Sequence, residues 1–194
     1  MTRKEIFVAP AAGGKTDYAL QLARTTAVSR HTVRICVPTT LQALALRRRL
    51  AAAGGALGIH MLTFDKLAAA CLDITGETYT QLSDPVLFRL LRTLIGQLPL
   101  HHYAPLQNKP GFVQIARQLI DELKAARVQP DAFATAVTHL AAAPRLTELA
   151  DIYTAYQARL QSEQWADRVG LHWLAVEALA ERAPAACRDW PLLI

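Results

Sequence analysis

The feature that most constrains this chain is a turn of small residues close to its N-terminus. An apolar run at residues 6–8 (I-F-V) leads into this turn, which ends in Gly-Gly-Lys-Thr at residues 13–16, and an amphipathic segment follows at once. A strand, a small-residue turn and a helix in this order are typical of a phosphate-binding loop, or P-loop. The sequence therefore predicts that this turn holds the phosphates of a nucleotide.

The residue types in the turn fit phosphate chemistry. Glycines let several backbone N–H groups point inward at phosphate oxygens, and the start of the following helix adds free donors and a favourable dipole. A lysine reaches the β- and γ-phosphates, and a Ser or Thr hydroxyl can ligate Mg²⁺. The residues predicted to bind the nucleotide are Ala11, Ala12, Gly13, Gly14, Lys15 and Thr16, and Thr16 is also the predicted contact to the metal.

The turn departs from the general P-loop pattern at its start. That pattern opens with Gly, whereas this chain has Ala9, and the Pro10 that follows has no N–H group to donate. The alternative reading is a glycine-rich turn that contains a lysine by chance. It leaves unexplained why Gly-Lys-Thr stands directly between an expected strand and an expected helix.

Beyond the turn, short apolar runs alternate with amphipathic segments as far as residue 75. Short connections between alternating strands and helices favour a parallel sheet that is covered by helices. The predicted fold class is therefore α/β, a P-loop NTPase parallel sheet with flanking helices, plus an inserted all-helical subdomain. The expected strands are 6–8, 33–37 and 59–63, and the expected helices are 15–28, about 40–53 with Thr39 as its cap, and 64–72.

From about residue 74 to residue 163 the pattern changes, and no convincing strand is expected. Apolar residues at steps of three and four predict a series of helices, the first beginning at Pro85 with Asp84 as its cap. Tyr153 and Tyr156 lie on a packing seam, which favours a place in the core over a role as base-stacking platforms. Asp167 is expected to cap a last helix. The predicted domains are 1–75 with 165–194 for the P-loop domain, and 76–164 for the helical insertion.

Composition excludes several classes of protein. The chain is 52% hydrophobic and 19% charged, so its 194 residues can bury a sizeable core. No apolar run is long enough to predict a membrane span, and the N-terminus does not resemble a signal peptide. The cysteines (Cys36, Cys71 and Cys187) are far apart and lack metal-binding spacing. We therefore expect reduced thiols and a cytoplasmic protein.

The positive charge is concentrated in the N-terminal part of the chain. Residues 1–75 hold ten Lys and Arg against four Asp and Glu, while residues 76–194 hold eleven against twelve. A nucleotide or a nucleic-acid backbone would be a suitable anionic partner, and a solvated basic face is the alternative. Arg47, Arg48 and Arg49 fan around one predicted helix, so at least one of them is expected to be free to meet an anion.

These motifs resemble the UvrD-like superfamily 1 helicases. Their P-loop begins with Ala and has the form A-x-x-G-x-G-K-[ST]. Ala9, Gly14, Lys15 and Thr16 match that form, while Ala12 stands where it has Gly.

The closer resemblance is to the B subunit of AddAB-type ATP-dependent helicase/deoxyribonucleases, and it covers nearly the whole chain in order. In that family the P-loop strand opens the chain, and the strand that carries the Walker B carboxylate follows the helical insertion. Leu192-Leu193-Ile194 stand where that strand would begin, so we expect the chain to be a piece of a longer protein. The matching segments are V-P at 37–38, T-F-x-x-L-A at 63–68, L-S at 82–83, P-G-F at 110–112, L-I-x-E-L-K at 119–124 and L-x-x-L-x-x-I-Y-x-x-Y-x-x-x-L at 146–160.

The resemblance implies ATP and Mg²⁺ as cofactors and DNA as a partner. Thr63 and Phe64 stand where superfamily 1 proteins touch single-stranded DNA, with a hydroxyl for phosphate and a ring for a base. Burial of Phe64 against the sheet is the alternative. Thr39 and Thr40 are a second expected DNA contact, at a place where the family usually has an acidic residue followed by Gln.

The function implied by the resemblance is that of an N-terminal nucleotide- and DNA-binding domain. The parent protein would be an ATP-dependent helicase/exonuclease subunit that acts with a partner subunit in double-strand break processing and recombinational repair. No catalytic residue is expected in this piece, because it stops before any Walker B carboxylate, arginine finger or nuclease motif. Two alternatives stay open: a degenerate P-loop scaffold, which Pro10 and Ala12 favour, and a small P-loop phosphotransferase, which the terminal strand disfavours.

Overall fold

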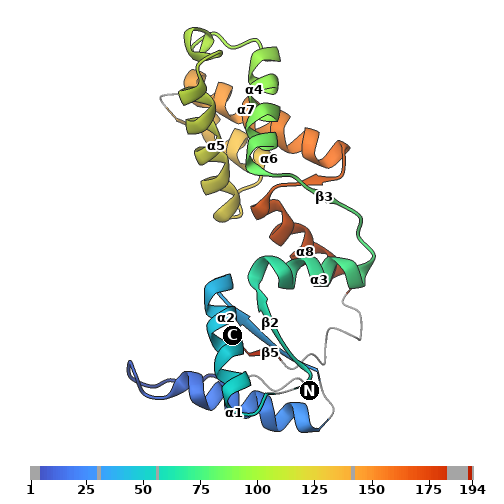
Figure 1. Ribbon diagram of the computed structural model, residues 1–194. Helices are drawn as coiled ribbons and strands as arrows, with labels where there is room; N and C mark the ends of the chain where they lie inside the picture. Colours follow the sequence, from blue (N-terminus) through green and yellow to red (C-terminus); the bar gives the residue numbers. More distant parts are fainter. Residues whose placement is uncertain (1–4, 30–31, 56, 141–142, 183–191, 194) are drawn as a thin grey trace. The chain divides into compact units, whose positions relative to one another are not determined.

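The computed structural model describes residues 5–29, 32–55, 57–140, 143–182 and 192–193. The chain divides into two compact units (Figure 1). We call Met1–Glu77 with Leu174–Ile194 the sheet unit, and Thr78–Trp173 the helical unit.

The sheet unit alternates helices with short strands. Its elements in chain order are α1 (Lys15–Val28), β1 (Val33–Val37), α2 (Thr40–Ala52), β2 (Ile59–Thr63), α3 (Phe64–Thr75) and β5 (Leu192–Leu193). Those of the helical unit are β3 (Thr80–Gln81), α4 (Asp84–Gln97), the 3₁₀ turn η1 (Ala104–Leu106), α5 (Pro110–Ala125), α6 (Pro130–Thr138), α7 (Ala143–Ser162) and β4 (Trp165–Ala166). The last helix, α8 (Arg168–Arg182), begins in the helical unit and ends in the sheet unit.

The three strands of the sheet unit are parallel and have the order β2-β1-β5. The β1–β2 register runs from Val33 opposite Ile59 to Val37 opposite Thr63. Alternate residues of β1 turn one face toward α1 and α2, because successive side chains of a strand point to opposite faces. On that face Val33, Ile35 and Val37 form a core with Leu20, Ala23, Ala43, Leu50 and Met61.

The prediction of a P-loop NTPase sheet is wrong. The described residues are mostly helical, with two strands of five residues (β1 and β2) and three of two residues (β3, β4 and β5). In this part of the chain residues 6–8 belong to no strand, and Ile6 and Val8 are 90% and 91% exposed.

The physical reason is the lack of a long neighbouring strand. A run of three residues needs the hydrogen bonds of an adjacent strand, because it has few contacts of its own. Among the described residues, β5 pairs with β1 at two positions, so it offers a short edge. Phe7 instead packs against Tyr18 of α1, with ring centroids 4.7 Å apart. Tyr18 is 48% exposed, so this ring contact lies at the surface.

The helical unit is built on a core between α4, α5 and α7 (Figure 1). The apolar stripes predicted for these helices supply it, and Tyr153 and Tyr156 are fully buried, as expected for a packing seam. The unit is not entirely helical, because β3 pairs in parallel with β4. The buried core comprises Leu87, Leu91, Leu94, Ile95, Leu100, Phe112, Val113, Ala116, Ile120, Ile152, Tyr153, Tyr156 and Leu160.

Several predicted boundaries are confirmed, namely both ends of α1, β1 and β2 and the start of α8 after Asp167. The start of α4 differs by one residue, since Ser83 is the cap and its carbonyl accepts from Leu87 N at 3.0 Å. Cys36 and Cys71 are buried, as expected for reduced thiols in a core. Cys187 and Ile194 lie outside the described residues.

Candidate functional sites

The predicted nucleotide loop is exposed and closes on itself. The N–H of Gly13 donates to the carbonyl oxygen of Pro10 at 3.1 Å. Ala12 and Gly14 have left-handed backbone angles, with φ of 60° and 74°. A Cβ atom at Gly13 would lie 2.9 Å from the Pro10 oxygen, so this position needs glycine. All six residues predicted to bind nucleotide, 11–16, are exposed.

The loop keeps donors available for an anion. Gly14 is the cap of α1 and makes no side-chain cap bond. The first N–H groups of a helix have no acceptor within it, so those of Lys15 and Thr16 remain available to a phosphate. Lys15 Nζ donates to the carbonyl oxygen of Pro10 at 3.0 Å and also to that of Ala9. A phosphate would have to exchange places with these carbonyls to bind the lysine.

An ion pair lies beside this loop. Asp17, in the first turn of α1, pairs with Arg49, in the last turn of α2. The side chains of Asp17 and Arg49 are 71% and 48% exposed, so the pair contributes at most about 1 kcal/mol to stability. The positive charge of Arg49 also offsets the negative charge of Asp17 next to Thr16.

The four predicted DNA contacts meet at the carboxyl edge of the sheet. β1 and β2 are adjacent and parallel, with Val37 opposite Thr63, so the residues that follow them emerge side by side. Thr39 caps α2, with its hydroxyl oxygen accepting from Gln42 N at 3.2 Å, as the sequence predicted. Thr63 caps α3 in the same way, accepting from Lys66 N at 3.4 Å.

This edge can offer both phosphate and base contacts. Each capping hydroxyl uses a lone pair as acceptor and keeps its own proton as a donor. Two helix starts also bring a favourable dipole for anions. Phe64 is 45% exposed rather than buried against the sheet, and Thr40 is exposed next to Thr39.

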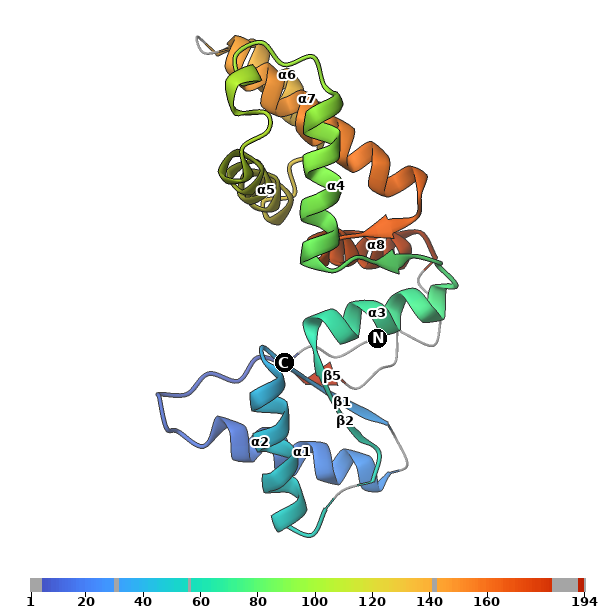
Figure 2. The same ribbon diagram turned by 45° about the horizontal axis from the view of Figure 1, so that its top comes forward.

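The structure does not bring the nucleotide loop to this edge. Figures 1 and 2 show the tip of the loop before α1 extending to the side of the sheet unit. Asp17, at the start of α1, pairs with Arg49 in the last turn of α2, the end of that helix opposite Thr39. The bonds that Lys15 makes in the structure are to the loop itself. The predicted nucleotide and DNA residues therefore form two separate groups.

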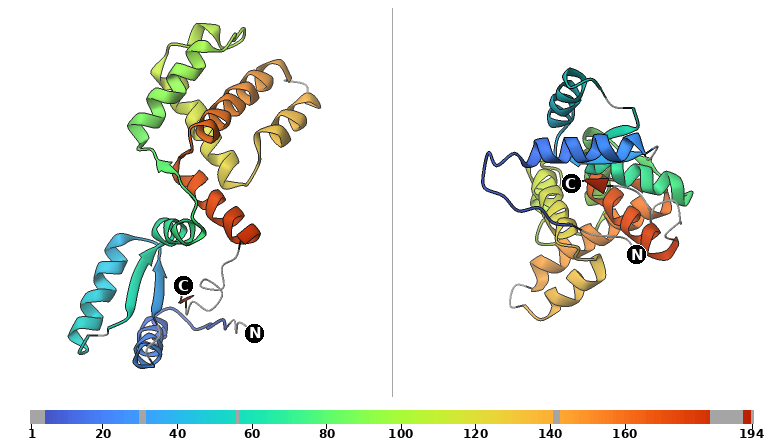
Figure 3. Two further views of the ribbon diagram at one scale, coloured as in Figure 1. Left: turned by 90° about the vertical axis from the view of Figure 1, so that its right-hand side faces the viewer. Right: turned by 90° about the horizontal axis from the view of Figure 1, so that it is seen from below.

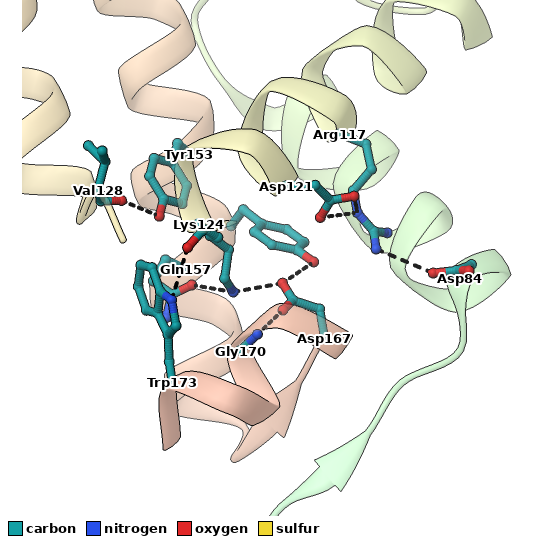
Figure 4. Close-up of polar contacts among 11 residues, drawn as sticks. Asp84, Arg117, Asp121, Lys124, Val128, Tyr153, Gln157, Asp167, Gly170 and Trp173 are labelled. Atoms are coloured by element: carbon teal, nitrogen blue, oxygen red, sulfur yellow. Dashed lines mark hydrogen bonds and ion pairs between the residues drawn. The ribbon is translucent and has the colours of Figure 1, made fainter. Parts of the chain in front are cut away.

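A third polar group, in the helical unit, was missed from sequence. The side chains of Lys124 (α5) and Asp167 are both 0% exposed, and Nζ lies 2.7 Å from Oδ2 (Figure 4). Asp167 also accepts hydrogen bonds from Tyr156 OH at 2.9 Å and from Gly170 N at 2.6 Å. Through the bond from Gly170, Asp167 caps α8, as predicted. Lys124 Nζ also donates a hydrogen bond to Gln157 Oε1, at 3.1 Å. We call these five residues the buried network.

The pKa shifts in the network follow from burial and pairing. Burial lowers the pKa of Lys124, against the attraction of Asp167. Burial alone would raise the pKa of Asp167, but the Lys124 charge and the bonds from Gly170 and Tyr156 hold that pKa below its ordinary value. Burial and the Asp167 charge raise the pKa of Tyr156. Lys124, Asp167 and Tyr156 are closed to solvent, so the role of the network is structural rather than catalytic.

One sequence signal could have found the network. Lys124 lies four residues after Ile120 and eight after Ala116, on the apolar stripe of α5. A lysine on such a stripe must be paired, because burial of a lone charge is costly. Its partner could not be identified, since Asp167 is 43 residues away in sequence.

The described residues contain no cluster of three or more His, Cys, Asp and Glu side chains that could hold a metal ion. None of the helices in this part of the chain combines the length and the apolar character needed to cross a membrane.

Comparison with known proteins identifies one family. The family described as ADDB, N-terminal matches residues 7–183, almost the whole chain. The curated proteins contain no match to this sequence.

Proposed function

Because the chain belongs to the AddB N-terminal family, we propose that it is the nucleotide- and DNA-binding N-terminal region of an ATP-dependent helicase/exonuclease subunit. In this role it would serve double-strand break processing and recombinational repair, together with a partner subunit. The observation that carries the proposal is the family match over residues 7–183.

The nucleotide site of this proposal is the loop at residues 11–16. Its support is the glycine-dependent turn at Gly13, the uncapped start of α1 and the lysine that follows. Lys15 would leave the Ala9 and Pro10 carbonyls and neutralise charge on the β- and γ-phosphates of ATP. The Thr16 hydroxyl is the group that would hold a Mg²⁺ ion, which would neutralise part of the phosphate charge.

Nucleotide binding is expected to be weak. Lys15 must give up bonds to two carbonyl oxygens before it can meet a phosphate. Pro10 contributes no N–H donor, and Ala12 holds a left-handed angle that favours glycine. We assign no catalytic residue and expect no ATP hydrolysis by this 194-residue chain.

The DNA site of this proposal is the carboxyl edge of the sheet. Thr39, Thr40 and Thr63 would donate hydroxyl protons to backbone phosphates, and the exposed ring of Phe64 would stack on a base. Stacking of a base on an aromatic ring is worth about 1–3 kcal/mol. Phe64→Ala should therefore weaken binding of a single-stranded oligonucleotide by roughly tenfold, measured by fluorescence anisotropy.

A second candidate function is a scaffold that binds no nucleotide. The observation in its favour is the state of the loop, in which Lys15 is bonded to carbonyl oxygens and residues 6–8 are unpaired and exposed. Such a domain would still offer the sheet edge to DNA.

Calorimetric titration with ATP·Mg²⁺ separates the two candidates. The variants are Lys15→Ala and, as a matched control, Lys109→Ala, which removes an exposed lysine in the helical unit. Weak binding that Lys15→Ala abolishes and Lys109→Ala preserves supports the nucleotide site. Equal and negligible heats for all three proteins support the scaffold. Turnover of ATP that depends on Lys15 would contradict our expectation of no hydrolysis.

A further inference from the structure

The helix α2 has apolar residues on both of its sides. Its inner side packs Ala43, Leu46 and Leu50 into the core of the sheet unit. On its outer side Leu41 is 78% exposed and Leu44 is 44% exposed. A surface helix normally turns polar residues to water, whereas a helix that is apolar all round is normally covered on all sides.

The outer residues form a continuous line along the helix. Leu41, Leu44, Ala45 and Arg48 recur at steps of three and four, so they lie on one face of α2, and all four are exposed. We call these four residues the outer stripe. Ala45, in its middle, is small enough to let another backbone approach closely. Figure 3 shows α2 at the outer side of the sheet unit in both views.

The charge of α2 is entirely positive. The helix carries Arg47, Arg48 and Arg49 near its end and contains no acidic residue. Arg49 is paired with Asp17, and Arg47 Nη2 donates to the carbonyl oxygen of Met61 at 3.3 Å. Arg48 therefore supplies the charge that continues the line of Leu41 and Leu44.

We propose that the outer stripe of α2 is a docking surface for an acidic amphipathic helix of a partner protein. The line of apolar residues at helical spacing fits the ridge of a second helix, and the positive charge of Arg48 at its end is complementary to a carboxylate on that helix. A nucleic-acid backbone would satisfy Arg48 but would leave Leu41 and Leu44 exposed. The inference rests on the proposed function only for the existence of a partner subunit.

The test uses two synthetic helical peptides of about 18 residues, long enough to hold some helix in solution. One has leucines at steps of three and four flanked by glutamates, and the other has lysines in place of the glutamates. Amide chemical shifts of the 194-residue protein are followed as each peptide is added. The acidic peptide is expected to perturb α2 around the outer stripe, while the basic peptide leaves it unchanged.

Variants of the stripe sharpen the test. Leu41→Ser with Leu44→Ser should weaken binding of the acidic peptide by at least about tenfold. Arg48→Glu should weaken that binding and create binding of the basic peptide. The matched controls are Ile115→Ser, at a residue of α5 that is 63% exposed, and Arg92→Glu, at an exposed residue of α4; neither should change binding.

Four results would overturn the proposal. One is no binding of the acidic peptide at millimolar concentration. A second is equal binding of the two peptides, and a third is binding of the acidic peptide that survives loss of both leucines. The fourth is binding of a single-stranded oligonucleotide that depends on Arg48 but not on Leu41 and Leu44, which would make the stripe a nucleic-acid surface. None of these variants touches the loop, so failure here is distinct from failure of nucleotide binding at Lys15.

Discussion

The two units each hold a lysine at a critical place, in opposite environments. Lys15 of the sheet unit is exposed and bonds to two backbone carbonyl oxygens of its own loop. Lys124 of the helical unit is fully buried and bonds to the side chains of Asp167 and Gln157. Both lysines are therefore satisfied, but by partners of different kinds.

The difference lies in how easily the partners can be exchanged. Water or a phosphate can replace a carbonyl at Lys15, because the loop is open to solvent. No such replacement is available to Lys124, and an unpaired charge at that depth is strongly unfavourable. A ligand-binding site needs exchangeable partners like those of Lys15. A fixed contact between helices needs permanent partners like those of Lys124.

The largest effect is expected from breaking the buried pair. Lys124→Met keeps the length of the side chain but leaves the Asp167 carboxylate buried without its cation. We expect the helical unit to lose about 3–5 kcal/mol of unfolding free energy. Urea unfolding monitored through tryptophan fluorescence measures this loss of unfolding free energy, because Trp165 and Trp173 both belong to the helical unit.

A double variant distinguishes the effect of an unpaired charge from a general failure of the variant to fold. Lys124→Met with Asp167→Asn removes both charges and keeps an oxygen to cap α8. It should recover a large part of the lost stability, because removing both charges of a buried pair is far less costly than removing one. A double variant that is less stable than Lys124→Met would contradict the view that an uncompensated charge causes the loss.

A smaller effect is expected at the two buried tyrosines, whose hydroxyl groups donate to different kinds of acceptor. Tyr156 OH donates to the Asp167 carboxylate, whereas Tyr153 OH donates to the Val128 carbonyl oxygen, each at 2.9 Å. Hydrogen bonds to charged groups are worth about 1.5–3 kcal/mol and those to neutral groups about 0.5–1.5 kcal/mol. Tyr156→Phe should therefore destabilise the helical unit more than Tyr153→Phe, in the same urea experiment.

Both tyrosines should act as neutral donors over the whole working range of pH. Burial, followed by the nearby Asp167 charge, raises the pKa of Tyr153 to about 12 and raises that of Tyr156 as well. The ranking of the two variants should thus be the same at pH 6 and pH 9. Equal losses for both would mean that the carboxylate adds nothing to the bond from Tyr156.

A pH-dependent effect is expected at Glu148, a buried carboxylate of α7. It accepts from the backbone N–H groups of His101, His102 and Tyr103 at 2.7–3.0 Å. Burial tends to raise the pKa of Glu148, but these hydrogen bonds hold it below its ordinary value. The ionised form is therefore the one that the fold favours.

The sign of the effect follows from that lowered pKa. The stabilisation is complete above the unfolded pKa of about 4.3 and is lost as the pH falls through the lower folded value. Glu148→Gln should cost about 1 kcal/mol at pH 7 and progressively less in acid. Asp17→Asn, which removes the exposed carboxylate of the sheet unit, is the control and should cost less at pH 7. A constant difference between wild type and Glu148→Gln from pH 7 to pH 3 would contradict this assignment.

Local signals account for most of the elements that could be predicted. Caps are short-range features, so the starts of α2, α3 and α8 at Thr39, Thr63 and Asp167 follow from a few adjacent residues. The strands β1 and β2 are bounded by turn residues and were predicted at their observed limits. Residues 6–8 have the composition of a strand, but a strand also needs hydrogen bonds to an adjacent strand, and composition does not show whether such a neighbour is present. The β3–β4 pair is too short to show any periodicity.

The candidate sites also differ in whether local sequence is enough to predict them. Parallel neighbours place Thr39 and Thr63 at one edge, so that grouping follows once β1 and β2 are known. The separation of the nucleotide loop from this edge depends on where residues 6–8 lie, which is a property of the whole sheet unit. The partners of Lys124 come from α7 and from the start of α8, and no local pattern connects them.

The smallest effect on stability is expected at Lys15, where the comparison began. Lys15→Ala removes two bonds to carbonyl oxygens that water can satisfy equally well, because the loop is exposed. Protection of the β1 and β2 amides against hydrogen exchange should change by less than about 0.5 kcal/mol, as for other exposed positions. Lys109→Ala is the matched control. A loss of protection as large as the loss of stability expected for Lys124→Met would contradict this prediction. It would mean that Lys15 stabilises the fold of the loop rather than remaining available to bind a phosphate.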